Sequence, residues 1–135
     1  MRKIASPYFK NLLEEVLDKE RIYYSFSSIE RLKNQLLLDT STIEVHDLGA
    51  GSRKKAGLYR TIQSIAKTAV SSTVQCAQLF RLVHFLQAKN RLEIGSSLGI
   101  SSLYQYFPIR NSNMYSLEGC PNIAQIAQST FDKLA

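Results

Sequence analysis

The feature that most limits the possible folds of this chain is a strand–helix–strand–helix pattern that begins after residue 89. Residues 91–94 indicate a short strand, residues 100–107 have helical character, residues 114–118 indicate a second strand, and Pro121 can open a last helix. Strands that alternate with helices over short connections are typical of a parallel sheet, because parallel strands need a crossover between them. The pattern therefore predicts the start of a doubly wound α/β sheet.

The part of the chain before this pattern is expected to be mostly helical. Apolar residues recur at three- and four-residue spacing in four segments, and the second segment is expected to be capped by Ser27 and Ser28. The four segments are residues 7–20, 29–37, 58–69 and 74–86. We therefore expect a helical region at 1–88 with a short strand and glycine turn at 42–52, followed by a sheet-forming region at 89–135.

Composition excludes several classes of protein. The chain has 135 residues, of which 44% are hydrophobic and 21% charged, as in an ordinary globular domain. No apolar run approaches the roughly 20 residues that cross a bilayer, and the N-terminus lacks the apolar core of a secretory signal. The two cysteines, Cys76 and Cys120, form neither a disulfide framework nor a metal cluster. We therefore expect a cytoplasmic protein with no membrane segment and no metal site.

Positive charge is concentrated in one part of the chain. The net charge is +6, and residues 48–92 contain no acidic residue but eight lysines and arginines. Such a stretch can attract nucleic acid or another anionic partner. It can also be a solvated face, or a face that meets acidic residues of another segment. The second interpretation is favoured, because no aromatic and basic motif for nucleic acid accompanies the charge.

Two glycine turns follow predicted strands and are candidates for holding a ligand. They are Asp-Leu-Gly-Ala-Gly at residues 47–51 and Glu-Ile-Gly-Ser-Ser-Leu-Gly at residues 93–99. Glycine lets backbone N–H groups approach a ligand without interference from a Cβ. The second turn has the better context, because a helix and a strand follow it and Glu118 closes that strand. A carboxylate in this place can accept hydrogen bonds from the ribose hydroxyls of an adenosine.

The second glycine turn, with Glu118 closing the next strand, resembles the first two motifs of the class I S-adenosylmethionine-dependent methyltransferases. Residues 92–104 and 117–121, together with the turn at 47–52, are similar to a bacterial subgroup of that family, and the likeness spans residues 28–135. The resemblance implies a Rossmann-like sheet, S-adenosylmethionine as the cofactor, and methyl transfer to an acceptor that the sequence does not identify.

The resemblance also implies roles for individual residues. The cofactor-binding residues would be Glu93, Gly95, Ser96, Ser97, Gly99 and Glu118. Glu93 would lie near the methionine end of the cofactor, and Glu118 would hold the ribose hydroxyls; their structural alternatives are a carboxylate that caps a turn and an acid at a helix N-terminus. Ser97 departs from the family, which often has glycine there. His46 and Asp47 are candidates for substrate contact, Asp47 with the alternative of a plain turn residue. No catalytic base is assigned.

By the same resemblance, the chain stops before the remaining strands of a seven-stranded sheet. Both predicted strands then keep an unpaired edge, and a two-stranded sheet is marginal. We therefore expect part of a methyltransferase, inactive by itself, that forms a homodimer through the open sheet edges. The alternative function is a non-catalytic helical module that binds nucleic acid or an acidic partner through residues 53–91. Dinucleotide binding is disfavoured, because Ser97 and Ile100 stand where that fingerprint needs glycine.

Overall fold

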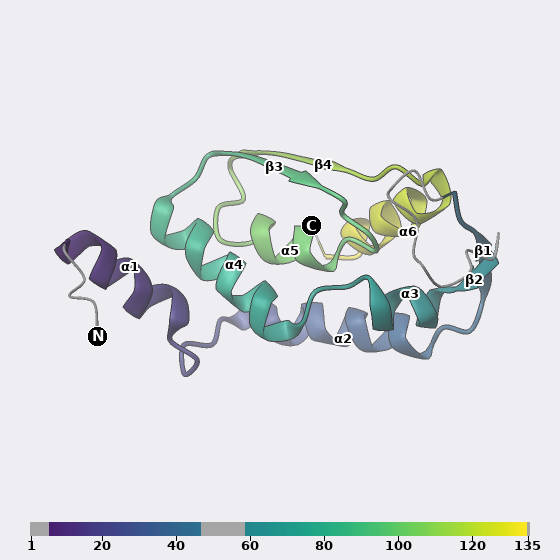
Figure 1. The fold of residues 1–135 in the computed structure, drawn as a ribbon, viewed down its shortest axis with the longest axis horizontal. Helices are drawn as coiled ribbons and strands as arrows, with labels where there is room; N and C mark the ends of the chain where they lie inside the picture. Colours follow the sequence, from purple (N-terminus) through teal and green to yellow (C-terminus); the bar gives the residue numbers. More distant parts are fainter. Residues whose placement is uncertain (1–5, 47–58, 135) are drawn as a thin grey trace.

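The computed structural model describes residues 6–46 and 59–134, and these residues form a mixed α/β fold (Figure 1). Its helices are α1 (Pro7–Leu17), α2 (Tyr24–Leu38), α3 (Ile62–Thr68), α4 (Thr73–Leu86), α5 (Ile100–Tyr106) and α6 (Pro121–Asp132). Its strands are β1 (Thr42–Glu44), β2 (Tyr59–Thr61), β3 (Asn90–Ile94) and β4 (Asn113–Leu117). None of the helices in the described residues is long and apolar enough to cross a membrane.

The C-terminal region has the predicted strand–helix–strand–helix order. β3 and β4 pair in parallel, with Leu92 opposite Tyr115 and Ile94 opposite Leu117, and α5 forms the crossover between them. The strands lie along one side of the molecule, with α4, α5 and α6 beneath them and α2 beyond (Figure 1). The expectation of a parallel α/β unit is confirmed.

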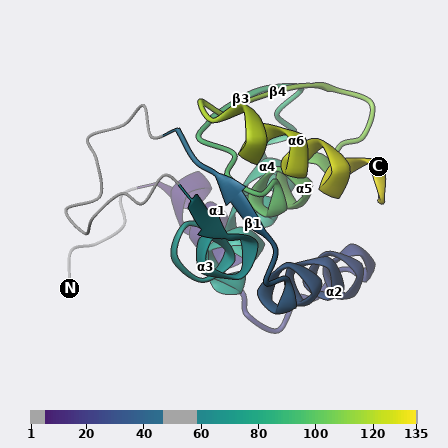
Figure 2. The same ribbon diagram turned by 90° about the vertical axis from the view of Figure 1, so that its right-hand side faces the viewer.

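The N-terminal region is less purely helical than the sequence predicted. The strand expected at residues 42–46 is shorter, and it pairs in antiparallel fashion with β2, which was not predicted; Ile43 lies opposite Arg60. Figure 2 shows this antiparallel pair beside α3. The third helix consequently begins at Ile62, where the Thr61 side chain accepts a hydrogen bond from the Ser64 N–H and caps it.

The second helix starts earlier than Ser27 and Ser28, which lie inside it. α2 begins at Tyr24, and Phe26 is already part of its buried stripe. The Phe26 ring packs against Phe80 of α4 and Tyr104 of α5, with centroids 4.9 and 5.0 Å apart. Aromatic packing therefore extends the helix beyond the expected serine cap, because it buries a large apolar side chain in the first turn.

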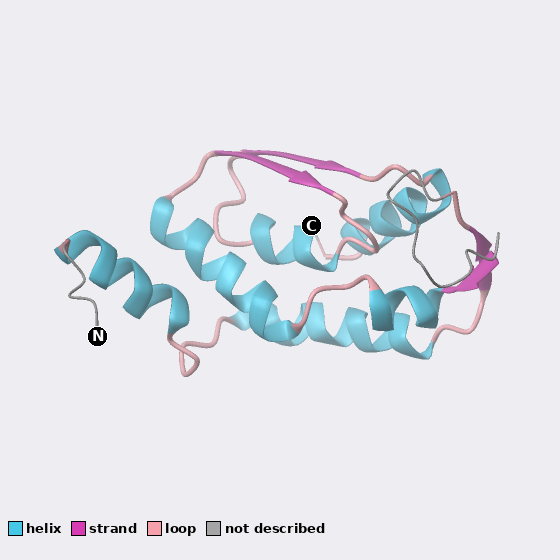
Figure 3. Cartoon of the chain, viewed as in Figure 1, coloured by secondary structure: helices cyan, strands magenta, loops and turns pink. Residues whose placement is uncertain are grey.

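A single buried cluster joins the two regions of the chain. Its centre is α5, whose residues Ile100, Ser102, Leu103 and Tyr104 are buried. Apolar side chains of α2, α3, α4 and α6 also belong to the cluster, and α2 and α3 lie below α5 in the view of Figure 3. The helical region and the sheet-forming region thus share one core.

The outer face of the β3–β4 sheet is apolar and exposed. Leu92, Ile94, Tyr115 and Leu117 point to this face and are between 54% and 81% exposed. Within the described residues, neither outer edge of the sheet pairs with another strand. The homodimer that the sequence analysis expects at these edges stays a prediction.

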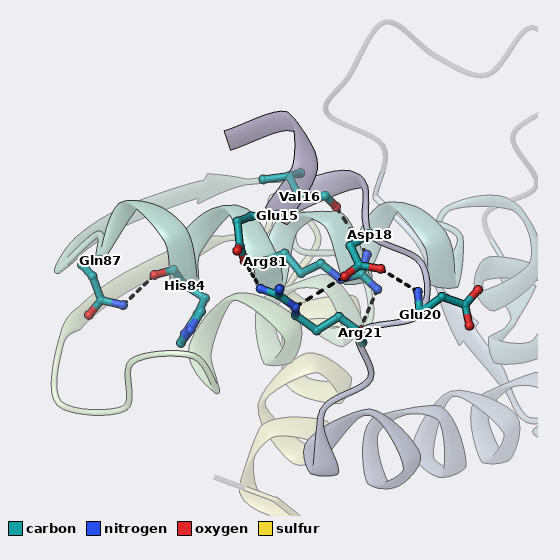
Figure 4. Close-up of polar contacts among 8 residues, drawn as sticks. All are labelled: Glu15, Val16, Asp18, Glu20, Arg21, Arg81, His84 and Gln87. Atoms are coloured by element: carbon teal, nitrogen blue, oxygen red, sulfur yellow. Dashed lines mark hydrogen bonds and ion pairs between the residues drawn. The ribbon is translucent and has the colours of Figure 1, made fainter. Parts of the chain in front are cut away.

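Two of the arginines in the basic stretch are buried in the fold. Arg81 is 5% exposed, and its guanidinium donates to the carbonyl oxygens of Val16 and Arg21, at 3.4 and 3.0 Å (Figure 4). Arg81 therefore fixes the C-terminal end of α1 and the segment after it against α4. In the same view, Arg21 forms ion pairs with Glu15 and Asp18.

Arg91 of β3 has the same kind of role at the other end of the basic stretch. It is 7% exposed and donates to the carbonyl oxygens of Gln105 and Ile109 and to the Ser112 hydroxyl. Burial lowers the pKa of its guanidinium. Arg91 therefore holds the end of α5 and the turn that leads to β4.

The core also holds two weak acids in their neutral form. Cys76 of α4 is fully buried, and burial raises the pKa of its thiol to about 11. Tyr104 is fully buried, and its hydroxyl donates to Glu30 Oε1 at 2.8 Å. Burial and this hydrogen bond raise the pKa of Tyr104 as well. Loss of either proton would therefore leave a negative charge in the core and lower the stability of the folded protein.

We expect the free energy of unfolding to decrease in alkaline solution. A group whose folded pKa is raised contributes its full stability below its unfolded pKa and loses that contribution as the pH rises to the folded value. For Cys76 this window runs from about pH 9 to about pH 11, and the loss is roughly 1 kcal/mol per pH unit. Urea denaturation at several pH values measures it. Cys76→Ala should show a shallower decrease, and an equal decrease in both proteins would contradict this role of the thiol.

Candidate functional site

The loop between β3 and α5 is tightly bound to the end of β4. Gly95 and Ser96 both donate their backbone N–H groups to the Leu117 carbonyl oxygen, at 2.8 and 3.1 Å. Gly95, Ser97 and Gly99 have positive φ angles of 85°, 49° and 83°. This left-handed backbone favours glycine, and serine adopts it only at a cost. The loop is therefore a shaped backbone surface at the carboxyl ends of two parallel strands, where ligands bind in open α/β sheets.

Glu118 joins this loop to the start of α6. One carboxylate oxygen accepts the Ser97 N–H at 2.9 Å, and the other accepts the Cys120 N–H at 3.0 Å. Glu118 is half-buried. A carboxylate has about four acceptor positions, so two hydrogen bonds leave capacity for further donors. The structure therefore brings Glu118 to the glycine loop, as the sequence analysis expected.

Glu93 has a different environment. Its carboxylate accepts hydrogen bonds from Ser101 Oγ at 2.7 Å, Gln105 Nε2 at 2.8 Å and Ser116 Oγ at 2.6 Å, and also from the Ser102 hydroxyl. These donors come from α5 and β4, on the helix-covered side of the sheet. Glu93 lines none of the described cavities around the loop. Its geometry favours the structural alternative over contact with a cofactor.

A cavity of about 370 Å³ opens on one side of the glycine loop. The loop side contributes Gly95, Ser97 and Glu118, and the N-terminal region contributes His46 and Arg60. Val45, Ala69, Gly119, Cys120 and Ile123 complete the lining. The cavity has a volume suited to a small-molecule ligand, and its lining combines apolar and polar side chains.

The other predicted loop residues line a second cavity. It has a volume of about 170 Å³ and includes Ser96, Gly99 and Glu118. Gly99 packs against α6, since a Cβ placed on it would lie 3.1 Å from the carbonyl oxygen of Ala127. Gly95 instead faces open space, with no atom within 4 Å of such a Cβ. Gly99 therefore lets α6 pack closely against the loop, whereas Gly95 leaves space open beside the loop in the larger cavity.

The structure describes one of the two candidate substrate residues. His46 lines the larger cavity. Its backbone N–H donates to Cys120 Sγ at 3.4 Å, and its ring Nε2 lies 3.7 Å from Glu44 Oε1. Asp47 lies outside the described residues. Within the described residues, no group of three or more His, Cys, Asp or Glu side chains gathers where it could hold a metal ion.

Sequence reasoning missed the part that Arg60 plays in this cavity. It was counted only as one charge of the basic stretch, because residues 58–69 were expected to form a helix that includes it. The available signal was Tyr59-Arg60-Thr61, a short run of residue types that are common in strands. A strand here pairs with β1 and brings Arg60 to the wall that His46 also lines.

Searches for related proteins give no identification. No family model, no curated protein and no solved structure matches this chain.

Proposed function

We propose that the chain is the cofactor-binding part of an S-adenosylmethionine-dependent methyltransferase, and that the cavity of about 370 Å³ receives the cofactor. The observation that carries the proposal is the meeting of Glu118 with Gly95 and Ser97 at the carboxyl ends of β3 and β4. The Rossmann-like identity of the incomplete sheet is part of the same proposal.

The residues around the cavity fit such a ligand. Gly95 leaves open the space that any other side chain would enter. Ser97 also lines the cavity, but its Oγ, which has no hydrogen-bond partner among the described residues, is buried and does not face that space. Glu118 can accept both ribose hydroxyls in addition to its two N–H donors. The Glu118 carboxylate thus suits the ribose of an adenosine moiety, whereas the N–H groups of Gly95, Ser96, Ser97 and Gly99 already bond within the protein.

When bound, S-adenosylmethionine supplies a methyl group activated by its sulfonium. This chain's own residues would bind and orient the cofactor. Glu118 would hold the sugar, and the backbone of the loop from Gly95 to Gly99 would lie beneath it. Such positioning is the main contribution of a protein to a displacement whose chemistry belongs to the cofactor.

The alternative function, binding of nucleic acid through residues 53–91, has less support. Of the eight positive charges in that stretch, Arg81 and Arg91 are buried and bound to carbonyl oxygens. A binding surface for phosphates needs its cations at the surface. We therefore favour the small-molecule site.

Isothermal titration with S-adenosylhomocysteine tests the proposal. We expect the protein to bind it, and Glu118→Ala to weaken the affinity at least tenfold, since two charge-assisted hydrogen bonds are lost. Glu20→Ala removes an exposed carboxylate far along the chain and should leave the affinity unchanged. Binding that Glu118→Ala does not alter would remove Glu118 from the site. No binding to the unaltered protein would overturn the proposal.

A further inference from the structure

We propose that Arg60 binds the carboxylate at the amino-acid end of the ligand in the larger cavity. The inference rests on the proposed function and assigns a residue of the same site to the amino-acid end of the ligand. Glu118 would hold the sugar hydroxyls, and Arg60 would hold the carboxylate of the zwitterionic amino-acid end.

The guanidinium of Arg60 is held in place by α3. Its Nη2 donates to the Ser64 carbonyl oxygen at 3.4 Å, to Ser64 Oγ at 3.2 Å and to Thr68 Oγ1 at 2.7 Å. Arg60 is half-buried, and its backbone is paired with Ile43 of β1. A side chain fixed in this way loses little conformational entropy when it binds a ligand. Arg60 is therefore prepared for a specific contact.

The charges on the cavity wall are separated by region. Among the described residues that line it, Arg60 is the one lysine or arginine and Glu118 is the one acidic residue. Arg60 comes from the N-terminal region, whereas Glu118 comes from the sheet-forming region. A ligand that carries hydroxyl donors on its sugar and a carboxylate at its amino-acid end matches this arrangement.

Arginine suits the contact because of its shape. The planar guanidinium offers five N–H donors, which can grip a carboxylate through two parallel hydrogen bonds. The bonds to Ser64 and Thr68 all use Nη2, so one side of the guanidinium is turned toward α3. Lysine would keep the charge but lose the paired geometry.

Two ligands that differ in the amino-acid end test the inference. S-adenosylhomocysteine carries the carboxylate, and 5′-methylthioadenosine keeps the adenosine but lacks it. We expect Arg60→Gln to weaken S-adenosylhomocysteine binding about tenfold or more in isothermal titration, and to leave 5′-methylthioadenosine binding within twofold. Arg60→Lys should fall between, and Arg31→Gln, which removes an exposed arginine of α2, should change neither affinity.

The outcomes separate this inference from the proposed function. If the unaltered protein binds both ligands and Arg60→Gln leaves S-adenosylhomocysteine binding intact, the role of Arg60 is wrong and the proposed function stands. If both affinities fall equally in Arg60→Gln and Arg60→Lys, Arg60 supports the fold instead of the carboxylate, which also overturns the inference. If neither ligand binds the unaltered protein, both proposals fail together.

Discussion

Gly99→Ala is expected to lower the free energy of unfolding by about 3 kcal/mol. Two costs combine at this position. The backbone has a φ of +83°, and a left-handed conformation costs a residue with a Cβ about 1–2 kcal/mol. The new Cβ would also lie 3.1 Å from the carbonyl oxygen and 3.2 Å from the Cα of Ala127, so α6 must shift, which costs about 1–3 kcal/mol.

Gly95→Ala is the matched control for this prediction. Its φ of +85° is nearly the same, but no atom lies within 4 Å of the added Cβ. It should therefore cost only about 1–2 kcal/mol, for the backbone alone. Urea denaturation of the two variants measures the difference, which isolates the packing of α5 against α6. Equal losses of stability would show that this close approach of Gly99 to Ala127 is absent in solution.

The parts of the fold that could be predicted from sequence are those with local signals. Pro121 at the start of α6, the glycine loop after β3 and the apolar residues of both strands all lie within the element that they mark. β2 could not be predicted in the same way. It has three residues, and its existence depends on pairing with β1 across a long stretch of chain. Such a short strand carries too little sequence pattern to be recognised alone.

In the candidate site, too, residues placed by local sequence signals could be predicted, whereas residues placed by contacts between distant segments could not. Glu118 was placed correctly beside the glycine loop, because parallel strands bring their carboxyl ends to one edge. Arg60 reaches the cavity through the β1–β2 pairing, and the strand-forming residue types beside it do not show which strand it pairs with or which wall it joins. The burial of Arg81 and Arg91 depends on carbonyl oxygens that other elements supply. A count of charges along the chain therefore overstates the positive surface.

Glu93 is the residue for which a sequence motif and the surrounding structure disagree most. The motif points to the cofactor, but Ser101, Ser102 and Gln105 of α5 and Ser116 of β4 all donate to the carboxylate. We expect Glu93→Ala to lower the free energy of unfolding by about 3 kcal/mol. Hydrogen bonds to a charged group contribute about 1.5–3 kcal/mol each but are not additive, and the substitution leaves several donors without an acceptor.

Glu93→Gln separates the structural role from contact with a ligand. Glutamine keeps the shape and one acceptor oxygen, and the serine hydroxyls can rotate to accept from its amide, so the loss should be only about 1 kcal/mol. Because Glu93 lines neither cavity beside the loop, S-adenosylhomocysteine affinity should stay within twofold of the unaltered protein. Urea denaturation and isothermal titration on the same samples measure both quantities. A stable Glu93→Gln protein with a tenfold weaker affinity would instead mean that the carboxylate turns toward the ligand when the site is filled.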